Sequence, residues 1–217
     1  MARDLNPTAA PIVVQMAGAR TGNRRKSQAG ASEFQYGAGS LCLDFAGTLE
    51  NQGALNVDLL SSPERLEEWL RGPELPLPVG GLTDEDLSVA HALRDAIDKV
   101  ARAHIAGTPA ATVDVRCINS FAQHPTPVFL LQSGGRSRTV VEESGIDATL
   151  SVIARDAVHL LTGFDSHRLR QCARVGCSTL FFDRSPSGRR RWCSMKGCGE
   201  MVASASYRKR RTTEVMA

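Results

Sequence analysis

The chain has 217 residues, of which 42% are hydrophobic and 5% aromatic, and its formal net charge at neutral pH is +3. This length suits one mid-sized domain together with a small second one. No segment reaches the ~18 apolar residues that a membrane span needs. The apolar stretch at 11–19 is too short for the core of a signal peptide. The composition therefore indicates neither a membrane protein nor a secreted one.

The first third of the chain holds few strong structural signals. Residues 1–34 are rich in small and polar residues without periodicity, which predicts a disordered tail. The apolar run Leu41–Ala46 is equally compatible with a helix and a strand. A short helix is predicted over Pro63–Arg71, because Ser62 is a favourable N-cap and proline suits the first helical position.

The middle of the chain alternates helices with a hairpin. The longest helix is predicted over Asp84–Ile105, where Thr83 and an acidic residue three positions later form a capping box. A second helix is expected over Val113–Ala122, and a third over about 146–164. Between them, the strand-like runs 128–132 and 137–142 flank a Ser-Gly-Gly turn, which is typical of a β-hairpin.

These elements predict an α+β fold with mostly antiparallel pairing. We expect a mostly helical domain with a β-hairpin at 35–167 and a small finger at 168–212. Cys42 and Cys117 lie singly in apolar contexts typical of core thiols. His104 continues an apolar helical stripe, and we interpret it as a residue at the edge of the core. The sequence contains no nucleophile elbow, metalloprotease, Walker or dinucleotide-binding motif, so it does not predict an enzyme.

Four cysteines near the C-terminus follow the pattern C-x4-C-x15-C-x4-C: Cys172, Cys177, Cys193 and Cys198. Thiolate sulfur is a preferred ligand of Zn²⁺, and four protein ligands make a closed structural site. Disulfides and unrelated buried thiols are the alternatives, but disulfides favour secreted proteins. We therefore predict one structural zinc ion. A segment of this size, about 45 residues with few large apolar groups, could not fold without its metal.

The spacer between the two cysteine pairs predicts further structure. Strand-forming residues at Ser178–Asp183 and Arg189–Cys193 flank a Ser-Pro-Ser-Gly turn, which predicts a β-hairpin. A helix is expected over Gly199–Arg211. A knuckle, a hairpin and a last cysteine pair at a helix start form a treble-clef-like arrangement.

Charge is strongly segregated along the chain. Residues 168–217 contain 12 Lys and Arg against 3 Asp and Glu, so residues 1–167 carry the compensating negative charge. Concentrated positive charge is typical of nucleic-acid binding. Some arginines could instead neutralise the thiolates, and the terminal run could be a solubilising tail. The predicted nucleic-acid contacts are Arg189, Arg190, Arg191, Lys196, Arg208, Lys209, Arg210 and Arg211.

Several of these segments resemble a known family. The segments 172–177, 180–185, 188–195 and Cys198-Gly199 are similar to the CGNR zinc finger, and Gly39–Phe45 resembles the opening of the ABATE domain. The resemblance implies a cytoplasmic bacterial transcription regulator related to stress, with the finger as its DNA-binding part. It also implies that the four cysteines are the zinc ligands.

The chain departs from the family pattern at two places. Glu200-Met201 stands where the finger has Asn-Arg, and Gly47 stands where the N-terminal motif commonly has Asn. If the Asn-Arg pair contacts DNA, this chain binds more weakly or elsewhere. If the pair only caps the last helix, Glu200 can still serve, because a negative side chain is favoured near a helix N-terminus.

We therefore expect a zinc-dependent DNA-binding regulator. The alternatives are a zinc-stapled module that binds an acidic protein, an RNA-binding protein that stacks Trp192 on a base, and a thiol switch that loses zinc on oxidation. A homodimer and a small-molecule effector on the N-terminal domain are expected from architecture alone.

Overall fold

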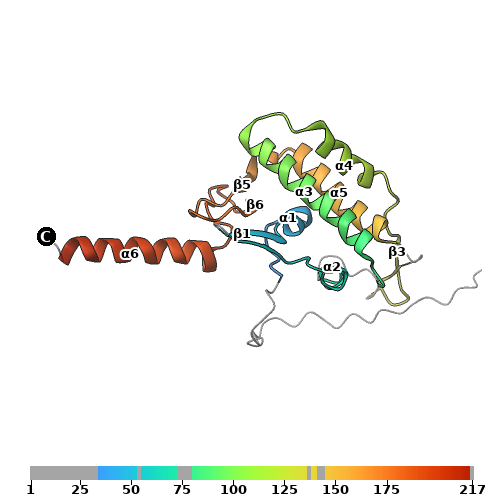
Figure 1. Ribbon diagram of the computed structural model, residues 1–217, viewed down its shortest axis with the longest axis horizontal. Helices are drawn as coiled ribbons and strands as arrows, with labels where there is room; N and C mark the ends of the chain where they lie inside the picture. The colour runs from blue at the N-terminus through green and yellow to red at the C-terminus, as the bar shows by residue number, and fades with distance from the viewer. Residues whose placement is uncertain (1–33, 53–54, 73–79, 136–137, 141–144, 216–217) are drawn as a thin grey trace, which may run out of the picture.

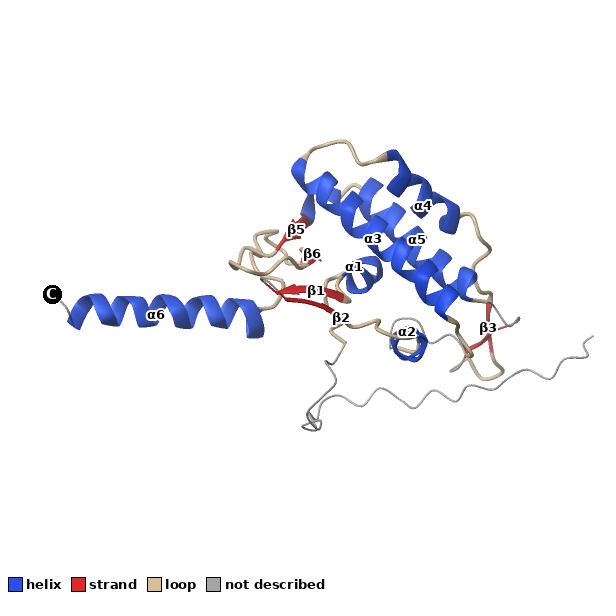
Figure 2. Ribbon diagram, viewed as in Figure 1, coloured by secondary structure: helices blue, strands red, loops and turns tan. Residues whose placement is uncertain are grey.

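The computed structural model describes residues 34–52, 55–72, 80–135, 138–140 and 145–215. The predicted tail therefore lies outside the described residues except for Phe34. This part of the chain is mainly helical (Figure 2). Its helical elements are α1 (Leu41–Ala46), α2 (Pro63–Leu70), α3 (Asp84–Ala106), α4 (Thr112–Ala122), α5 (Ile146–Thr162), the short turns η1 (Ser166–Arg168) and η2 (Met195–Gly199), and α6 (Glu200–Val215).

The strands form three separate two-stranded sheets, each of them antiparallel. This arrangement confirms the predicted α+β class with antiparallel pairing. No helix in the described segments has the length and apolar character needed to cross a membrane. The strands are β1 (Leu49–Gln52), β2 (Leu55–Asp58), β3 (Phe129–Leu131), β4 (Arg138–Val140), β5 (Leu169–Gln171) and β6 (Leu180–Phe182).

The helix predictions are confirmed to within two residues at each end, except that α6 continues four residues past the predicted end at Arg211. At the start of α3, the backbone N–H of Asp86 donates to Thr83 Oγ1 at 3.2 Å, and the Thr83 N–H donates back to the Asp86 carboxylate at 2.8 Å. This reciprocal capping satisfies two of the donors that a helix start leaves unpaired. At its other end, α3 stops at Gly107, which adopts a left-handed conformation with φ of 65°.

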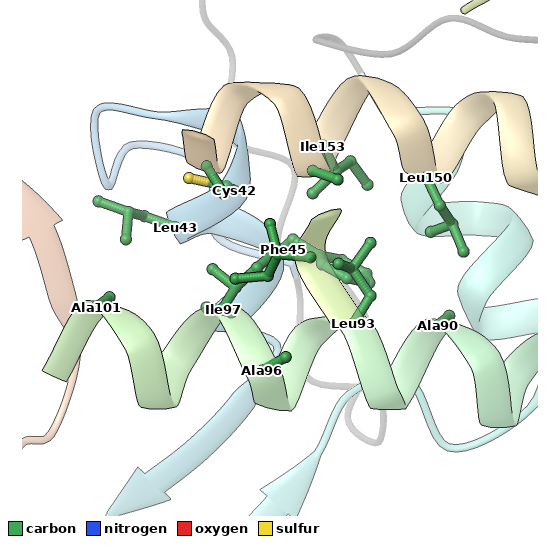
Figure 3. Packing of buried hydrophobic residues seen from close by; sticks show 14 of the residues in the cluster. Cys42, Leu43, Phe45, Ala90, Leu93, Ala96, Ile97, Ala101, Leu150 and Ile153 are labelled. Carbon is green, nitrogen blue, oxygen red and sulfur yellow. The ribbon is translucent and has the colours of Figure 1, made fainter. Parts of the chain in front are cut away.

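The segment at 41–46, whose type the sequence left open, is a helix that lies between α3 and α5 (Figure 3). Its start is stabilised from a distance, because the Asp156 carboxylate of α5 accepts from the Cys42 N–H at 2.8 Å and from the Ser40 hydroxyl. Cys42 is fully buried, as predicted, and Phe45 packs between Ile97 of α3 and the α5 side of the core.

The hairpin of β1 and β2 was not predicted. An ion pair ties it to α3, where the Arg94 guanidinium binds both Asp58 carboxylate oxygens at 2.7 and 3.0 Å. Arg94 is only 3% exposed, whereas the Asp58 side chain keeps 32% of its surface exposed. Removal of Asp58 would leave the buried guanidinium with Asp95, which Arg94 Nε also contacts at 3.1 Å, as its charged partner.

The prediction of a hairpin inside the cysteine spacer is wrong. Strand β6 does form, but it pairs with β5, which precedes the first cysteine, and residues 189–193 form no strand. The physical reason is burial: Leu169 of β5 and Leu180 of β6 are 4% exposed and belong to the main core. Pairing β5 with β6 buries both leucines, whereas the arginine run at 189–191 has no apolar face to offer.

Candidate metal centre and basic finger

The structure brings the four predicted cysteines together. Their sulfur atoms all lie within 4.8 Å of one another, and Sγ–Sγ distances are 3.9 Å for Cys177–Cys193 and 3.5 Å for Cys193–Cys198. Four sulfurs around a tetrahedral Zn²⁺ with bonds of about 2.3 Å would be about 3.8 Å apart. A disulfide needs about 2.05 Å, and all the cysteines are free thiols. The donor set therefore fits a metal ion with four tetrahedral ligands.

The first cysteine pair lies on the turn that joins β5 to β6. The Cys177 N–H donates to the Arg174 carbonyl at 3.0 Å, and the Cys172 N–H donates to the Thr179 carbonyl at 3.0 Å. The turn passes through Gly176, whose φ of 78° lies in the left-handed region that favours glycine. The sequence C-x4-C thus becomes a compact knuckle with both sulfurs on one side.

The second cysteine pair brackets a wide helical turn. Ser194 caps η2, because its Oγ accepts from the Gly197 N–H at 3.1 Å, while the Gly199 N–H donates to the Ser194 carbonyl at 2.9 Å. This five-residue spacing places Cys193 just before the cap and Cys198 within the turn. The chain then continues directly into α6.

A half-buried arginine approaches the sulfur cluster, and sequence reasoning did not single it out. Arg174 Nε donates to Cys198 Sγ at 3.0 Å. This bond raises the pKa of Arg174, so the guanidinium stays charged beside the sulfur. The position of Arg174 between the first two cysteines could have predicted this contact, because hydrogen bonds to thiolates stabilise metal ligands.

The thiols themselves cannot all ionise unaided. Burial opposes ionisation of Cys177, but its hydrogen bonds with Thr179, Cys172 and Cys198 lower its pKa to about 7. Burial and the neighbouring sulfurs raise the pKa of Cys193. A cluster in which one thiolate raises the pKa of the next is the environment that a divalent cation stabilises.

Asp183 organises the loop between the two pairs. Its side chain is fully buried and accepts from the Ser185 N–H at 2.9 Å and from the Arg190 N–H at 2.8 Å. Burial opposes its ionisation, but these hydrogen bonds and the nearby Arg170 lower the pKa of Asp183 below its usual value. The carboxylate therefore closes the loop in place of the predicted hairpin.

The three arginines before Cys193 are not equivalent. Arg189 and Arg191 are exposed, whereas Arg190 is half-buried. The Arg190 guanidinium lies 4.7 Å from the Phe181 ring centroid and donates to the carbonyl oxygens of Trp192 and Cys193. Arg190 therefore holds the ligand loop, and only its two neighbours point into solvent.

The remaining predicted contacts lie on η2 and α6. Lys196 is exposed on η2, and Arg208, Arg210 and Arg211 are exposed on α6, which also contains Lys209. Figure 1 shows α6 projecting away from the rest of the described chain. Glu200 is exposed at the first residue of α6, but the helical path already starts at the Ser194 cap, so Glu200 lies more than one turn from that cap.

The finger is fixed to the helical domain on its β5–β6 side. Arg102 of α3, which binds the Asp98 carboxylate, also donates to the Ser178 carbonyl at 3.0 Å. On the other side of the strands, the Phe182 N–H donates to the Ala38 carbonyl and Arg184 Nε donates to the Gly39 carbonyl, both at 2.6 Å. The knuckle is thus a part of the main body, while α6 is not.

Two family models match the chain. Residues 39–163 match the ABATE family, described as "Putative stress-induced transcription regulator", and residues 168–211 match the CGNR zinc finger. No curated protein matches the chain. The ABATE match spans more than half of the sequence, and the cysteine cluster coincides with the finger match. The chain therefore belongs to the ABATE family and carries a C-terminal CGNR zinc finger.

Proposed function

We propose that this protein is a zinc-dependent DNA-binding regulator that contacts DNA through its C-terminal finger. The observation that carries the proposal is the attachment of exposed cations directly to the ligand positions. Arg191 lies two residues before Cys193, Lys196 lies two residues before Cys198, and α6 begins two residues after Cys198. Exposed cations on a rigid support are suited to a row of DNA phosphates.

In this proposal, Zn²⁺ is held by Cys172, Cys177, Cys193 and Cys198 and has a structural role. A site closed by four thiolates keeps no open position at which a metal could activate water. The metal joins the knuckle on the helical body to the η2–α6 segment, which carries four of the seven exposed cations in the described part of the finger. The family description, a transcription regulator, supports a non-enzymatic function. A location in the bacterial cytoplasm is part of the same proposal.

A module that binds an acidic protein and an RNA-binding protein are the alternatives. Trp192 is half-buried, and the Arg191 guanidinium already lies 5.5 Å from its ring centroid. This favours phosphate contact by the arginine over base stacking on the indole face. Dimerisation and an effector of the helical domain stay predictions.

The test is selection by the zinc-loaded full-length protein from a pool of genomic DNA fragments, with a matched RNA pool and a Cys193→Ser variant as control. The proposal expects one DNA sequence to be enriched by the wild type and not by the variant. It expects the affinity for that fragment to fall steeply with salt. The logarithm of the binding constant plotted against the logarithm of the salt concentration should have a slope of about −0.9 for each phosphate contacted. Weak, shallow binding to any polyanion would instead place the finger among protein-interaction modules.

A further inference from the structure

Helix α6 has almost no protein surface to cover it. From Met201 to Arg211 its described side chains are exposed except for the half-buried Val202. It continues directly from η2 and extends away from the body (Figure 1). Isolated helices of about this length are only marginally stable in water, and a helix that is polar all round needs a partner or internal ion pairs to persist.

Four successive backbone positions near the end of α6, 208–211, carry cationic residues. Successive residues of an α-helix are about 100° apart, so the four consecutive positions 208–211 span about 300° of the circumference. A flat acidic surface on a protein or a membrane could face only part of this ring. A groove with phosphates along both of its walls could face most of it.

The turn of α6 that comes just before these cationic positions carries only small side chains. Residues 203–206 read Ala-Ser-Ala-Ser, and all four are exposed. Without large side chains, this turn stays at the slim end of the usual helix diameter of about 10–12 Å. The major groove of B-form DNA is about 12 Å wide and admits one α-helix. The Ser206 hydroxyl donates to the Val202 carbonyl at 2.9 Å, which leaves Ser204 as the candidate for a contact with a base edge.

We infer that α6 enters the major groove of B-form DNA, with its Ala-Ser-Ala-Ser turn facing the bases and the cations at 208–211 contacting phosphates on both walls. This inference rests on the proposed function and adds the groove and the element that occupies it. Arg189 and Arg191, which precede the cysteine pair on the finger, then contact phosphates outside the groove. The metal fixes the start of α6 and therefore its angle of entry.

Duplex RNA provides a sharp comparison. An A-form duplex carries the same phosphate charge, but its major groove is too deep and narrow for a protein helix. We would measure the affinity of the zinc-loaded full-length protein for the best-bound DNA fragment and for an RNA duplex of the same sequence. Ala205→Trp fills the narrow turn without changing charge, Ala205→Pro breaks the helix, and Ala205→Ser is the matched conservative control. Zinc content and helical circular dichroism would be recorded for each variant.

We expect DNA to bind roughly tenfold more tightly than RNA, and Ala205→Trp and Ala205→Pro to lose about that factor on DNA alone. Ala205→Ser should bind as the wild type does. Equal affinity for the two duplexes, or a Trp variant that keeps its DNA affinity, would overturn the groove assignment while leaving DNA binding intact. Tighter binding of the RNA duplex would also overturn it and favour an RNA-binding protein. A wild type that binds neither duplex would overturn the proposed function as well.

Discussion

Arg190 Nε donates a hydrogen bond to the carbonyl oxygen of Trp192 at 2.8 Å, so this arginine turns back onto its own ligand loop. The same guanidinium contacts the Cys193 carbonyl and stacks over Phe181. Each of the three adjacent arginines carries one positive charge, but they have two different roles. One shapes the metal site and two face the solvent.

Replacement of Arg190 should damage the finger itself. Arg190→Ala removes charge-assisted hydrogen bonds to two carbonyl oxygens. We expect this loss to lower the stability of the folded finger by about 2 kcal/mol. The variant should release zinc to a chelator faster than the wild type, as followed with a colorimetric zinc indicator. Arg189→Ala is the matched control and should release zinc at the wild-type rate. Equal rates for the two variants would show that Arg190 does not support the loop.

Asp183 should stabilise the fold through its buried carboxylate. Asp183→Ala leaves the N–H groups of Ser185 and Arg190 without their acceptor, and we expect it to lower the free energy of unfolding by about 1–3 kcal/mol. Asp183→Asn keeps one acceptor oxygen and should cost less. Urea denaturation of the zinc-loaded proteins would measure both differences.

The pH dependence of that effect follows from the lowered pKa of Asp183. A carboxyl group whose pKa is lower in the folded state stabilises the protein above its unfolded pKa, and this contribution is lost as the pH falls through the folded value. The wild type and Asp183→Asn should therefore differ in their free energy of unfolding by the same amount from about pH 8 to pH 5. The reason is that the Asp183 carboxylate of the wild type is ionised throughout this range. A difference that shrinks between pH 7 and pH 5 would mean that the pKa of Asp183 is raised instead.

Gly39 should tolerate no side chain. Its φ is 90°, and a Cβ atom placed there would lie 2.7 Å from the Phe182 carbonyl oxygen of β6. Gly81 is the matched control, because its φ of 69° is also positive but its surroundings are open. Gly81→Ala should lower the free energy of unfolding by about 1 kcal/mol from backbone strain. Gly39→Ala should lower the free energy of unfolding by at least about 1 kcal/mol more than Gly81→Ala does, because of the clash. Equal losses of stability for the two variants in thermal unfolding would contradict the close approach of Gly39 to the Phe182 carbonyl oxygen.

Metal removal should affect the two parts of the chain differently. A chelator should abolish DNA binding, because the η2–α6 segment loses its attachment to the knuckle. Most helical circular dichroism should remain, since α3 and α5 are held by the main core. Zn²⁺ should restore binding, and Mg²⁺, which prefers oxygen ligands, should not. Loss of the whole helical signal would show that the domain depends on the metal too.

Local chemistry explains which elements the sequence could predict. The capping box at Thr83, the proline after Ser62 and the C-x4-C pairs each act over a few residues, so α3, α2 and the cysteine cluster were predictable. The elements that the sequence left open or predicted wrongly depend on distant partners. Helix α1 is selected by Asp156, more than 110 residues away, and β6 chooses β5 because Leu169 and Leu180 share one core.

The roles of the basic residues show the same limit. Their number and clustering predicted a basic finger, but sequence cannot tell an exposed arginine from one that turns inward. Arg190 differs from Arg189 and Arg191 only because Phe181 and two carbonyl groups lie within its reach. Arg174 and Asp183 acquire their roles in the same way, from a sulfur atom and two amides that the fold brings near.

The salt dependence of DNA binding tests the central claim most directly. The best-bound genomic fragment would be titrated across a salt series with the zinc-loaded wild type, with Arg189→Ala/Arg191→Ala, and with Arg71→Ala/Arg116→Ala, which removes the same charge from the helical domain. Phosphate contact by the finger predicts that the log–log slope flattens by about 2 in the first variant and stays unchanged in the second. An unchanged slope in the first variant, or equal flattening in both, would contradict phosphate contact by Arg189 and Arg191 of the finger.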